Sequence, residues 1–472
     1  MVFDPVSFDN LLKPKSVAII GASRTRGFYW VRSFLEYGFP GKIFPVNPKE
    51  KEVLGLKCYP SILDVPQDVD FAVIAVPAPI VPKVLEDCAK KGVKLVTIFS
   101  SGFSETGTKE GILLEKKVAE IIRKTGIRAF GPNCMGVYAP QQSLSFRPDL
   151  PKDSGNVGFI SQSGGNAIGV VICGAVWGLK FSKVFSYGNA ADLDSIDLLE
   201  YLRWDEETKI IGLYIEGVKN GSKLLSVLKK TTAEKPVVVW KGGVTELGSK
   251  AVASHTGALA GSAQIWESVF KQANAVSVHS LEEMIDLLCV FSFLPPPRGK
   301  NIGILSISGG SSVVSADIAA QYGFNVPELP REVQEKIRKV VQPVGVNIKN
   351  PIDLASSFYN SDIMEYVLHE IMDHIDALIF DFQVHFLALR ERFGERGLVK
   401  KMIKVFVEVG RQYLAAGRPF LVVLPLNYCE KAWLESKNQF LNAKIPVFTS
   451  ILRAANALAK VYKFYQRKQQ YT

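Results

Sequence analysis

The stretch Lys15-Ser16-Val17-Ala18-Ile19-Ile20-Gly21-Ala22-Ser23-Arg24 decides the fold class of this 472-residue chain. Its apolar, β-branched run predicts a buried strand, and the small residues after it predict a tight turn into a helix over residues 28–37. Strand, turn and helix in this order open a parallel α/β domain. Further buried strands are predicted, with room for helices between them, at residues 43–46, 70–76 and 94–99.

The same pattern starts twice more along the chain. A strand at residues 157–160 leads into Ser161-Gln162-Ser163-Gly164-Gly165, and the apolar run 168–179 behind it predicts a helix buried on all sides. After the proline-rich connector 294–299, a strand at residues 302–306 leads into the turn 308–312. Later strands are predicted at residues 210–215, 236–240, 377–382 and 420–424. We therefore expect an α/β protein of three consecutive domains, with boundaries at 1–130, 131–290 and 291–472.

Composition narrows the class of protein. The chain is too long for one core, and 47% hydrophobic with 22% charged residues is typical of globular proteins, which excludes fibrous, coiled-coil and disordered classes. No secretory signal is recognised, and no apolar run reaches the ~20 residues of a membrane span. Six isolated cysteines indicate cytosolic thiols without a metal site, so we expect a cytoplasmic protein that binds no membrane. The net charge of +10 suits an anionic partner, but its even spread does not favour nucleic acid.

The turns after the opening strands are candidate anion sites, because free backbone N–H groups gather at a helix N-terminus. The first turn, residues 21–27, lacks the full GxGxxG motif of dinucleotide-binding proteins. The end of the second strand carries no acidic residue that could bind a ribose; it reads Val46-Asn47-Pro48-Lys49. This disfavours NAD and leaves NADP-like and coenzyme A-like ligands open, together with a turn needed only for packing. Two hydroxyls and two glycines in the second turn, 161–165, could hold a phosphoryl group. The third turn, 308–312, fits packing and binding equally well.

One histidine of the five stands out. His255 lies in the small-residue stretch 248–262, with no carboxylate or thiol beside it in sequence. An imidazole of this kind suits a nucleophile better than a metal ligand. The other four histidines stand beside apolar residues in predicted helices or strands, where a satisfied surface or core imidazole is the simpler interpretation.

Motifs along nearly the whole chain carry a family resemblance. They are SHTGALAGS around His255, VAIIGASR, KIFPVNPK, GLKCYPSI, AVPA, SSGFSETG, GPNCMGVYAP, GFISQSGG, WKGG and NPIDLA. The chain resembles the nucleoside-diphosphate-forming acyl-CoA synthetases, which include succinyl-CoA synthetase, and in particular the α subunit of archaeal ADP-forming acetyl-CoA synthetases. The resemblance implies a Rossmann-like CoA-binding domain followed by two flavodoxin-like domains of the succinyl-CoA synthetase type. No ATP-grasp domain is recognised, so it also implies a separate β subunit that binds ATP or ADP and Mg²⁺ in an α2β2 assembly.

The resemblance also assigns a reaction and its residues. In the family, phosphate attacks acyl-CoA to give acyl phosphate and CoA, and a histidine then carries the phosphoryl group to ADP. By resemblance, His255 is the nucleophile and Glu216 the carboxylate that orients it. The phosphoryl group is held by Ser161, Ser163, Gly164 and Gly165. Coenzyme A contacts Gly21, Ala22, Ser23, Arg24, Val46, Asn47, Lys49, Val76, Pro77, Ser100, Ser101, Gly102, Asn133 and Cys134.

One segment departs from the family pattern. After Arg24 the turn is about three residues shorter than expected and carries the bulky residues Phe28, Tyr29 and Trp30. This departure keeps open a CoA-binding regulatory paralogue without turnover, which the intact His255 and Glu216 disfavour. A Rossmann oxidoreductase is disfavoured by the basic second strand end.

Overall fold

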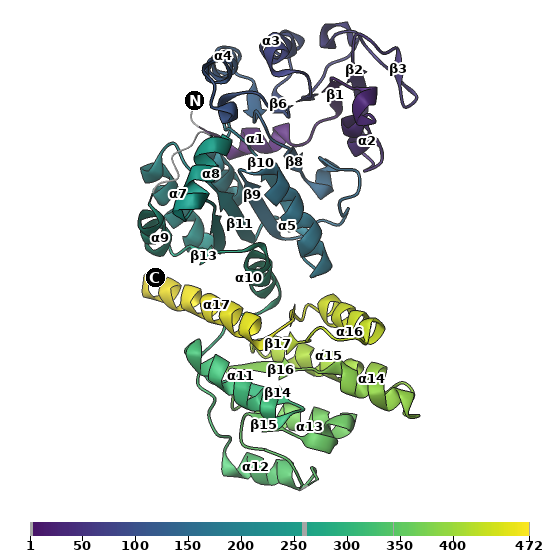
Figure 1. The fold of residues 1–472 in the computed structure, drawn as a ribbon, viewed down its shortest axis with the longest axis vertical. Coiled ribbons are helices and arrows are strands. Elements are labelled where there is room, and N and C mark those ends of the chain that lie inside the picture. Colours follow the sequence, from purple (N-terminus) through teal and green to yellow (C-terminus); the bar gives the residue numbers. More distant parts are fainter. Residues whose placement is uncertain (1–2, 257–261, 343, 472) are drawn as a thin grey trace. The chain divides into compact units, whose positions relative to one another are not determined.

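The computed structural model describes residues 3–256, 262–342 and 344–471. By internal contacts the chain forms two compact units, Met1–Met284 and Ile285–Thr472, which are described separately. The first unit contains two large sheets and the second contains one, each flanked by helices (Figure 1). These sheets confirm the predicted α/β fold with three consecutive sheet-and-helix domains.

The first sheet has the strand order β2-β1-β5-β6-β7, and its strands are parallel throughout. Its strands are β1 (Ser16–Ile20), β2 (Lys42–Val46), β5 (Phe71–Ile74), β6 (Leu95–Ile98) and β7 (Arg128–Phe130). Around it lie α1 (Pro5–Leu11), α2 (Tyr29–Leu35), α3 (Val81–Lys91), α4 (Lys109–Thr125) and the hairpin β3 (Glu52–Val53) with β4 (Leu56–Lys57). β1, β5 and β6 are buried along their whole length because helices cover both faces of a parallel sheet.

The second sheet has the order β13-β12-β11-β9-β10-β8, and only β8 among these strands runs antiparallel to its neighbour. Its strands are β8 (Gly136–Tyr138), β9 (Val157–Ser161), β10 (Phe181–Ser186), β11 (Ile210–Ile215), β12 (Val237–Lys241) and β13 (Val276–Val278). Its helices are α5 (Gly164–Val176), α6 (Ser195–Trp204), α7 (Gly221–Glu234), α8 (Glu246–Thr256), α9 (Ala263–Gln272) and α10 (Leu281–Phe293), the last of which runs into the second unit.

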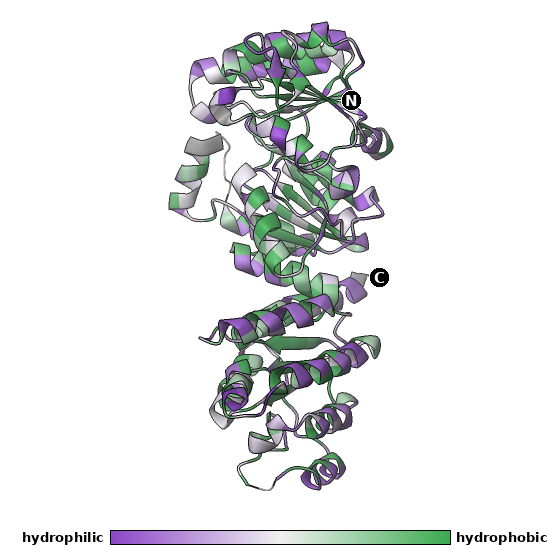
Figure 2. Ribbon diagram, turned by 90° about the vertical axis from the view of Figure 1, so that its right-hand side faces the viewer, coloured by the Kyte–Doolittle hydropathy of each residue, from purple (hydrophilic) through white to green (hydrophobic). Residues whose placement is uncertain are grey.

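The second unit is built on a five-stranded parallel sheet of order β15-β14-β16-β17-β18. Its strands are β14 (Ile302–Ser306), β15 (Ile352–Asp353), β16 (Ala377–Asp381), β17 (Phe420–Val423) and β18 (Val447–Phe448). Its helices are α11 (Gly309–Gln321), α12 (Arg331–Arg338), α13 (Ser361–Met372), α14 (Val384–Arg392), α15 (Leu398–Ala415), α16 (Glu430–Asn442) and α17 (Ile451–Tyr471). Hydrophobic strands lie between helices with hydrophilic outer faces (Figure 2).

All three sheets place the candidate turns at equivalent points. The strand that precedes each turn has a strand from later in the chain on both of its sides: β1 lies between β2 and β5, β9 between β10 and β11, and β14 between β15 and β16. The strand order therefore reverses beside β1, β9 and β14. Ligands of open α/β sheets bind at the carboxyl ends of the strands at such reversals. The turns after residues 20, 160 and 306, singled out from sequence, all lie there.

Two predicted elements need correction. The helix expected over residues 28–37 is the shorter α2, which follows the 3₁₀ turn η1 (Arg24–Arg26). The helix after the second turn is not buried on all sides, because α5 packs on its sheet along one face and leaves Ile172 38% and Val176 54% exposed. Among the described residues, no helix is both long and apolar enough to cross a membrane.

Candidate functional site

The first turn is shaped by a glycine that the fold requires. Gly21 has φ +95°, and a Cβ built on it would lie 2.4 Å from the carbonyl oxygen of Ala75, at the end of β5. Its N–H donates to the carbonyl of Val46 at 2.9 Å. Only glycine combines this backbone conformation with so close an approach. The turn therefore bridges β2 and β5 and exposes its backbone at the edge of the sheet.

Asn47 holds the turn from the second strand. Its side-chain Nδ2 donates to the carbonyl of Ala22 at 2.5 Å, and its Oδ1 accepts the N–H of Lys49 at 2.9 Å. Arg24 is 76% exposed and its Nε lies 3.1 Å from the carboxylate of Glu50. Such a surface pair contributes little to stability, so a stronger anion could draw the guanidinium away.

The residues after this turn explain the short, bulky sequence there. Ser23 caps η1 by accepting the N–H of Thr25 at 3.3 Å, and Phe28 then adopts a left-handed conformation with φ 56°. α2 begins only at Tyr29 and has seven residues. The turn thus offers backbone and side chains of residues 21–23, instead of the N-terminus of a long helix.

The other segments expected to contact CoA are hydrogen-bonded to one another. Ser100 Oγ donates to the carbonyl of Val76 at 2.5 Å, and the N–H of Asn133 donates to the carbonyl of Ser100 at 2.9 Å. The N–H of Gly102 donates to Glu105 Oε1 at 2.6 Å. The ends of β5, β6 and β7 therefore form one edge of the first sheet, which we call the CoA edge after the ligand expected there. Pro77 and Ser101 lie exposed along it.

The second turn is a capped helix N-terminus. Ser163 Oγ accepts the N–H of Asn166 at 3.3 Å, and the buried Ser161 Oγ donates to the carbonyl of Ser163 at 2.6 Å. Gly164 and Gly165 form the first residues of the thirteen-residue α5. Their N–H groups have no partner further back in the helix, and the helix dipole favours an anion beside them. Ser161 therefore shapes the turn, while Ser163 and the glycines face the site.

Glu216 is fixed beside this turn by Gln162. Glu216 follows β11 and is 5% exposed. Its N–H donates to Gln162 Oε1 at 2.9 Å, and its Oε1 accepts the hydroxyl of Tyr214 at 3.1 Å. Gln162 in turn donates its own N–H to the carbonyl of Tyr214 at 3.1 Å. One amide side chain thus ties the carboxylate-bearing strand end to the start of α5.

A buried cation lies near Glu216. Lys241 ends β12, is 6% exposed, and its Nζ lies 5.1 Å from the ring centre of Trp266 and donates to the carbonyl of Gly242. Burial lowers the pKa of Lys241 to about 8, and the negative charge of Glu216 opposes that shift. The ammonium is therefore still largely protonated at pH 7 and partly offsets the charge of Glu216.

His255 lies in α8, one residue before the helix ends. Its side chain is outside the described residues, as are residues 257–261 of the small-residue stretch. The described part of α8 is anchored by Ser249, whose Oγ donates to the carbonyl of Gly243 at 2.9 Å. The helix also contacts the 3₁₀ turn η4 (Ser104–Thr106), which follows the CoA edge. The pairing of His255 with Glu216 stays a prediction.

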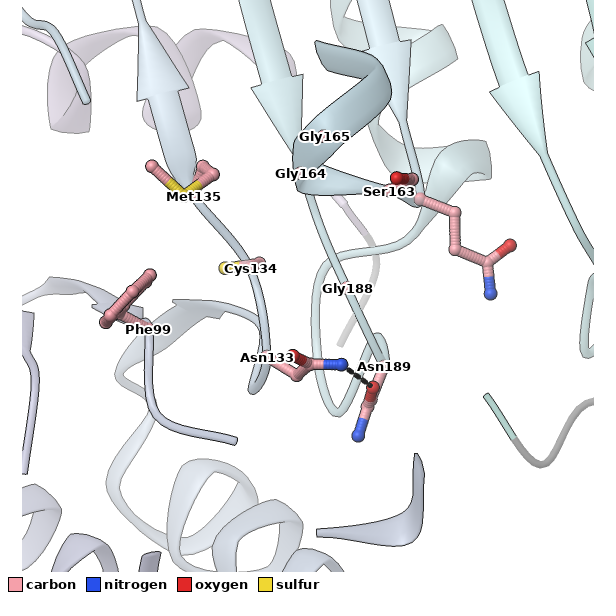
Figure 3. Close-up of a pocket in the computed structure, with 10 residues that line it drawn as sticks. Phe99, Asn133, Cys134, Met135, Ser163, Gly164, Gly165, Gly188 and Asn189 are labelled. Atoms are coloured by element: carbon pink, nitrogen blue, oxygen red, sulfur yellow. Dashed lines mark hydrogen bonds between the residues drawn. The ribbon is translucent and has the colours of Figure 1, made fainter. Parts of the chain in front are cut away.

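One cavity of about 220 Å³ lies between the CoA edge and the start of α5 (Figure 3). It is lined by Phe99, Asn133, Cys134, Met135, Gln162, Ser163, Gly164, Gly165, Gly188 and Asn189. Half of these residues are site residues predicted from sequence: Asn133 and Cys134 from one segment, and Ser163, Gly164 and Gly165 from a second segment some thirty residues further along the chain. The sequence reasoning missed the other half. Gln162 could have been found, since it stands inside the selected turn, but no motif marks Gly188 or Asn189.

Asn189 links the cavity to the CoA edge. Its Nδ2 donates to Glu105 Oε2 at 2.6 Å and to Glu115 Oε2 at 2.8 Å, and its Oδ1 accepts Asn133 Nδ2 at 3.4 Å (Figure 3). Glu105 in turn accepts the N–H of Gly102. This network connects the cavity floor with residues 102–105 and holds Asn133 in place.

Cys134 is a wall of the cavity and not a nucleophile. Burial raises the pKa of its thiol to about 12. About one thiol in 10⁴ is therefore ionised at pH 8, and only the thiolate attacks electrophiles. We expect iodoacetamide at pH 8 to leave Cys134 unmodified in the folded protein, while the partly exposed Cys173 and Cys429 react. Peptide mass spectrometry measures this, with urea-unfolded protein as the control; alkylation of Cys134 as fast as Cys429 would contradict it.

Comparisons with known proteins match this arrangement. Residues 15–140 match the family model described as "CoA binding domain", and residues 154–291 match "Succinyl-CoA ligase like flavodoxin domain". The chain is 38% identical to an ADP-forming acetate–CoA ligase II of Archaeoglobus fulgidus, over 98% of this chain and 67% of that protein. It is 37% identical to the α subunit of an ADP-forming acetate–CoA ligase I of Pyrococcus furiosus, over 97% and 98% of the two chains.

A solved structure extends the likeness to three dimensions. It is the dinucleotide-forming acetyl-coenzyme A synthetase 1 of Candidatus Korarchaeum cryptofilum, in complex with phosphate and ADP. The TM-score is 0.83 at 32% identity, and the match covers 98% of this chain and 97% of that one.

Proposed function

Because this chain belongs to the family of ADP-forming acetate–CoA ligases, we propose that it is the α subunit of an ADP-forming acyl-CoA synthetase. It interconverts acyl-CoA, ADP and phosphate with the free acid, ATP and CoA. Coenzyme A binds at the carboxyl edge of the first sheet, and phosphate binds at the start of α5.

The reaction proceeds in three transfers. An oxygen of phosphate attacks the thioester carbonyl carbon, a C–O bond forms, the C–S bond breaks, and CoA leaves as the thiolate. A ring nitrogen of His255 then attacks phosphorus, so that a P–N bond forms and the P–O bond to the acid breaks. Finally, the terminal oxygen of ADP takes the phosphoryl group from His255 and completes ATP. Glu216 orients the imidazole and stabilises its positive charge.

The shared cavity is the observation that carries this proposal. It brings the capped N-terminus of α5, through Ser163, together with Asn133 and Cys134 from the CoA edge. A thioester at the CoA edge and a phosphate at the helix start would therefore meet in one cavity. Phosphoryl transfer depends on positioning and on stabilising charge, and a helix start with fixed N–H groups supplies both.

The nucleotide half of the reaction requires an ATP-grasp β subunit. We infer an α2β2 complex in which that partner binds ADP or ATP with Mg²⁺. A relative that is 37% identical over 97% of this chain is named as an α subunit, and that name supports the proposal of a partner subunit. A cytoplasmic location fits six cysteines that stand singly in the sequence and are free thiols in the structure.

The direct test is to co-express the chain with its ATP-grasp β subunit and measure ATP formed from acetyl-CoA, ADP and phosphate. We expect ATP and free thiol to appear in equal amounts, and neither to appear when phosphate is omitted. Tight CoA binding without ATP from any of several acyl-CoAs would overturn the proposal and favour a binding subunit without turnover.

A further inference from the structure

We infer that the cavity between Phe99 and the start of α5 holds the acyl group, and that Phe99 restricts this group to a short aliphatic chain. The inference rests on the proposed function and names its substrate class. Phe99 immediately follows β6, precedes Ser100 of the CoA edge, and lines the same cavity as Asn133 and Cys134, where the proposed function places the thioester.

The cavity has a polar side and an apolar side (Figure 3). Ser163 and Gly164 at the helix start form the side suited to phosphate and the reacting carbonyl. Phe99 and Met135 form the apolar side. Because the carbonyl carbon must lie beside the phosphate, the remainder of the acyl group extends towards these two side chains.

Phe99 is held in place by residues of the short turn. Trp30 is buried, and its ring meets the ring of Phe99 edge-on with centroids 5.2 Å apart. Tyr29 packs edge-on against Trp30 at 5.6 Å, and its hydroxyl donates to the carbonyl of Phe146 at 2.8 Å. The N–H of Phe99 also donates to the carbonyl of Ile74 at 3.0 Å. The aromatic residues of this turn thus restrict the movement of the Phe99 ring out of the cavity.

Met135 lies on the same apolar side, between Phe99 and the start of α5. Its N–H donates to Ser186 Oγ at 3.1 Å, and a Cβ built on Gly164 would lie 2.8 Å from its Cγ. The methionine therefore packs directly on the first turn of α5. Pockets for drug-sized ligands have volumes of roughly 300–1,000 Å³, so a cavity of about 220 Å³ that must also admit phosphate leaves room for only a small acyl group.

The test compares two substrates in one preparation of the α–β complex. The ratio of kcat/KM for acetyl-CoA to kcat/KM for phenylacetyl-CoA does not depend on the fraction of active protein. We expect this ratio to be at least about 10² in the wild type, and to fall at least about 10-fold in Phe99→Ala, because pocket shape discriminates substrates by such factors. Phe99→Leu should lower the same ratio by a smaller factor, and it replaces Phe99→Ala in the test if the alanine variant does not fold.

Phe393→Ala is the matched control, since Phe393 is 81% exposed and does not line the cavity; it should leave the ratio unchanged. Equal use of both substrates by the wild type, or an unchanged ratio in the Phe99 variants, overturns this inference while ATP from acetyl-CoA still supports the proposed function. Failure to form ATP from every acyl-CoA overturns the proposed function itself.

Discussion

The His255→Asn variant, assembled with the ATP-grasp β subunit, is expected to form ATP from acetyl-CoA at no more than about 10⁻⁴ of the wild-type rate. Asparagine has no nitrogen that can accept and release a phosphoryl group, so the two later transfers lose their carrier. CoA binding should persist, because the CoA edge is formed by the ends of β5, β6 and β7 and not by α8. Coupled ATP assays and calorimetric titration with CoA measure the two effects.

His279→Asn is the matched control. His279 is exposed beyond the end of β13, in the same unit, and its N–H donates to Glu283. This variant should keep the full rate of ATP formation. A His255→Asn rate within about 10-fold of the wild type would mean that another group carries the phosphoryl, or that it passes directly from acyl phosphate to ADP.

The second large effect is expected at Glu216. In Glu216→Gln the side chain keeps its shape and can still accept the Tyr214 hydroxyl, but it loses the negative charge to which the proposed mechanism assigns the orientation of the imidazole and the stabilisation of its positive charge. Replacing such an orienting carboxylate lowers turnover by about 10² to 10⁴-fold. We expect kcat to fall within this range while KM for acetyl-CoA changes little, because Glu216 follows β11 of the second sheet, whereas the CoA edge belongs to the first sheet.

Tyr214→Phe distinguishes charge from hydrogen bonding at the same carboxylate. It removes the hydroxyl 3.1 Å from Glu216 Oε1 but leaves the carboxylate itself and the hydrogen bond from the Glu216 backbone N–H to Gln162. The loss of one hydrogen bond is worth about 1 kcal/mol, so kcat should fall only about 5-fold. Equal losses in the two variants would assign Glu216 a structural role and contradict its proposed part in the reaction.

The sequence predicted the sheets and turns well for a clear physical reason. Strands such as residues 210–215 are buried on both faces, so they appear as short apolar runs bounded by small residues, and β11 has the predicted bounds. The turns at Gly21 and Ser163 follow such runs, and their places at the strand-order reversals come from topology common to open α/β sheets.

The features of the fold and of the site that the sequence did not predict depend on contacts between segments that are distant in the chain. The exposed face of α5 at Ile172 and Val176 was missed because an apolar helix looks the same whether one side or all sides are covered. Phe99 and Asn189 carry no motif; they enter the site only because β6, β7 and the loop after β10 end near one another. The role of Trp30 likewise became visible only through its contact with Phe99.

The most direct measurement is to incubate the α–β complex with acetyl-CoA and ³²P-labelled phosphate in the absence of ADP, and then to map the label by peptide analysis. We expect a label that is lost in acid and kept in base, located on His255, formed only with phosphate and acyl-CoA together, and discharged as ATP when ADP is added. Label on another residue, or ATP formation at the full rate with no label on His255, would contradict transfer through a phosphohistidine.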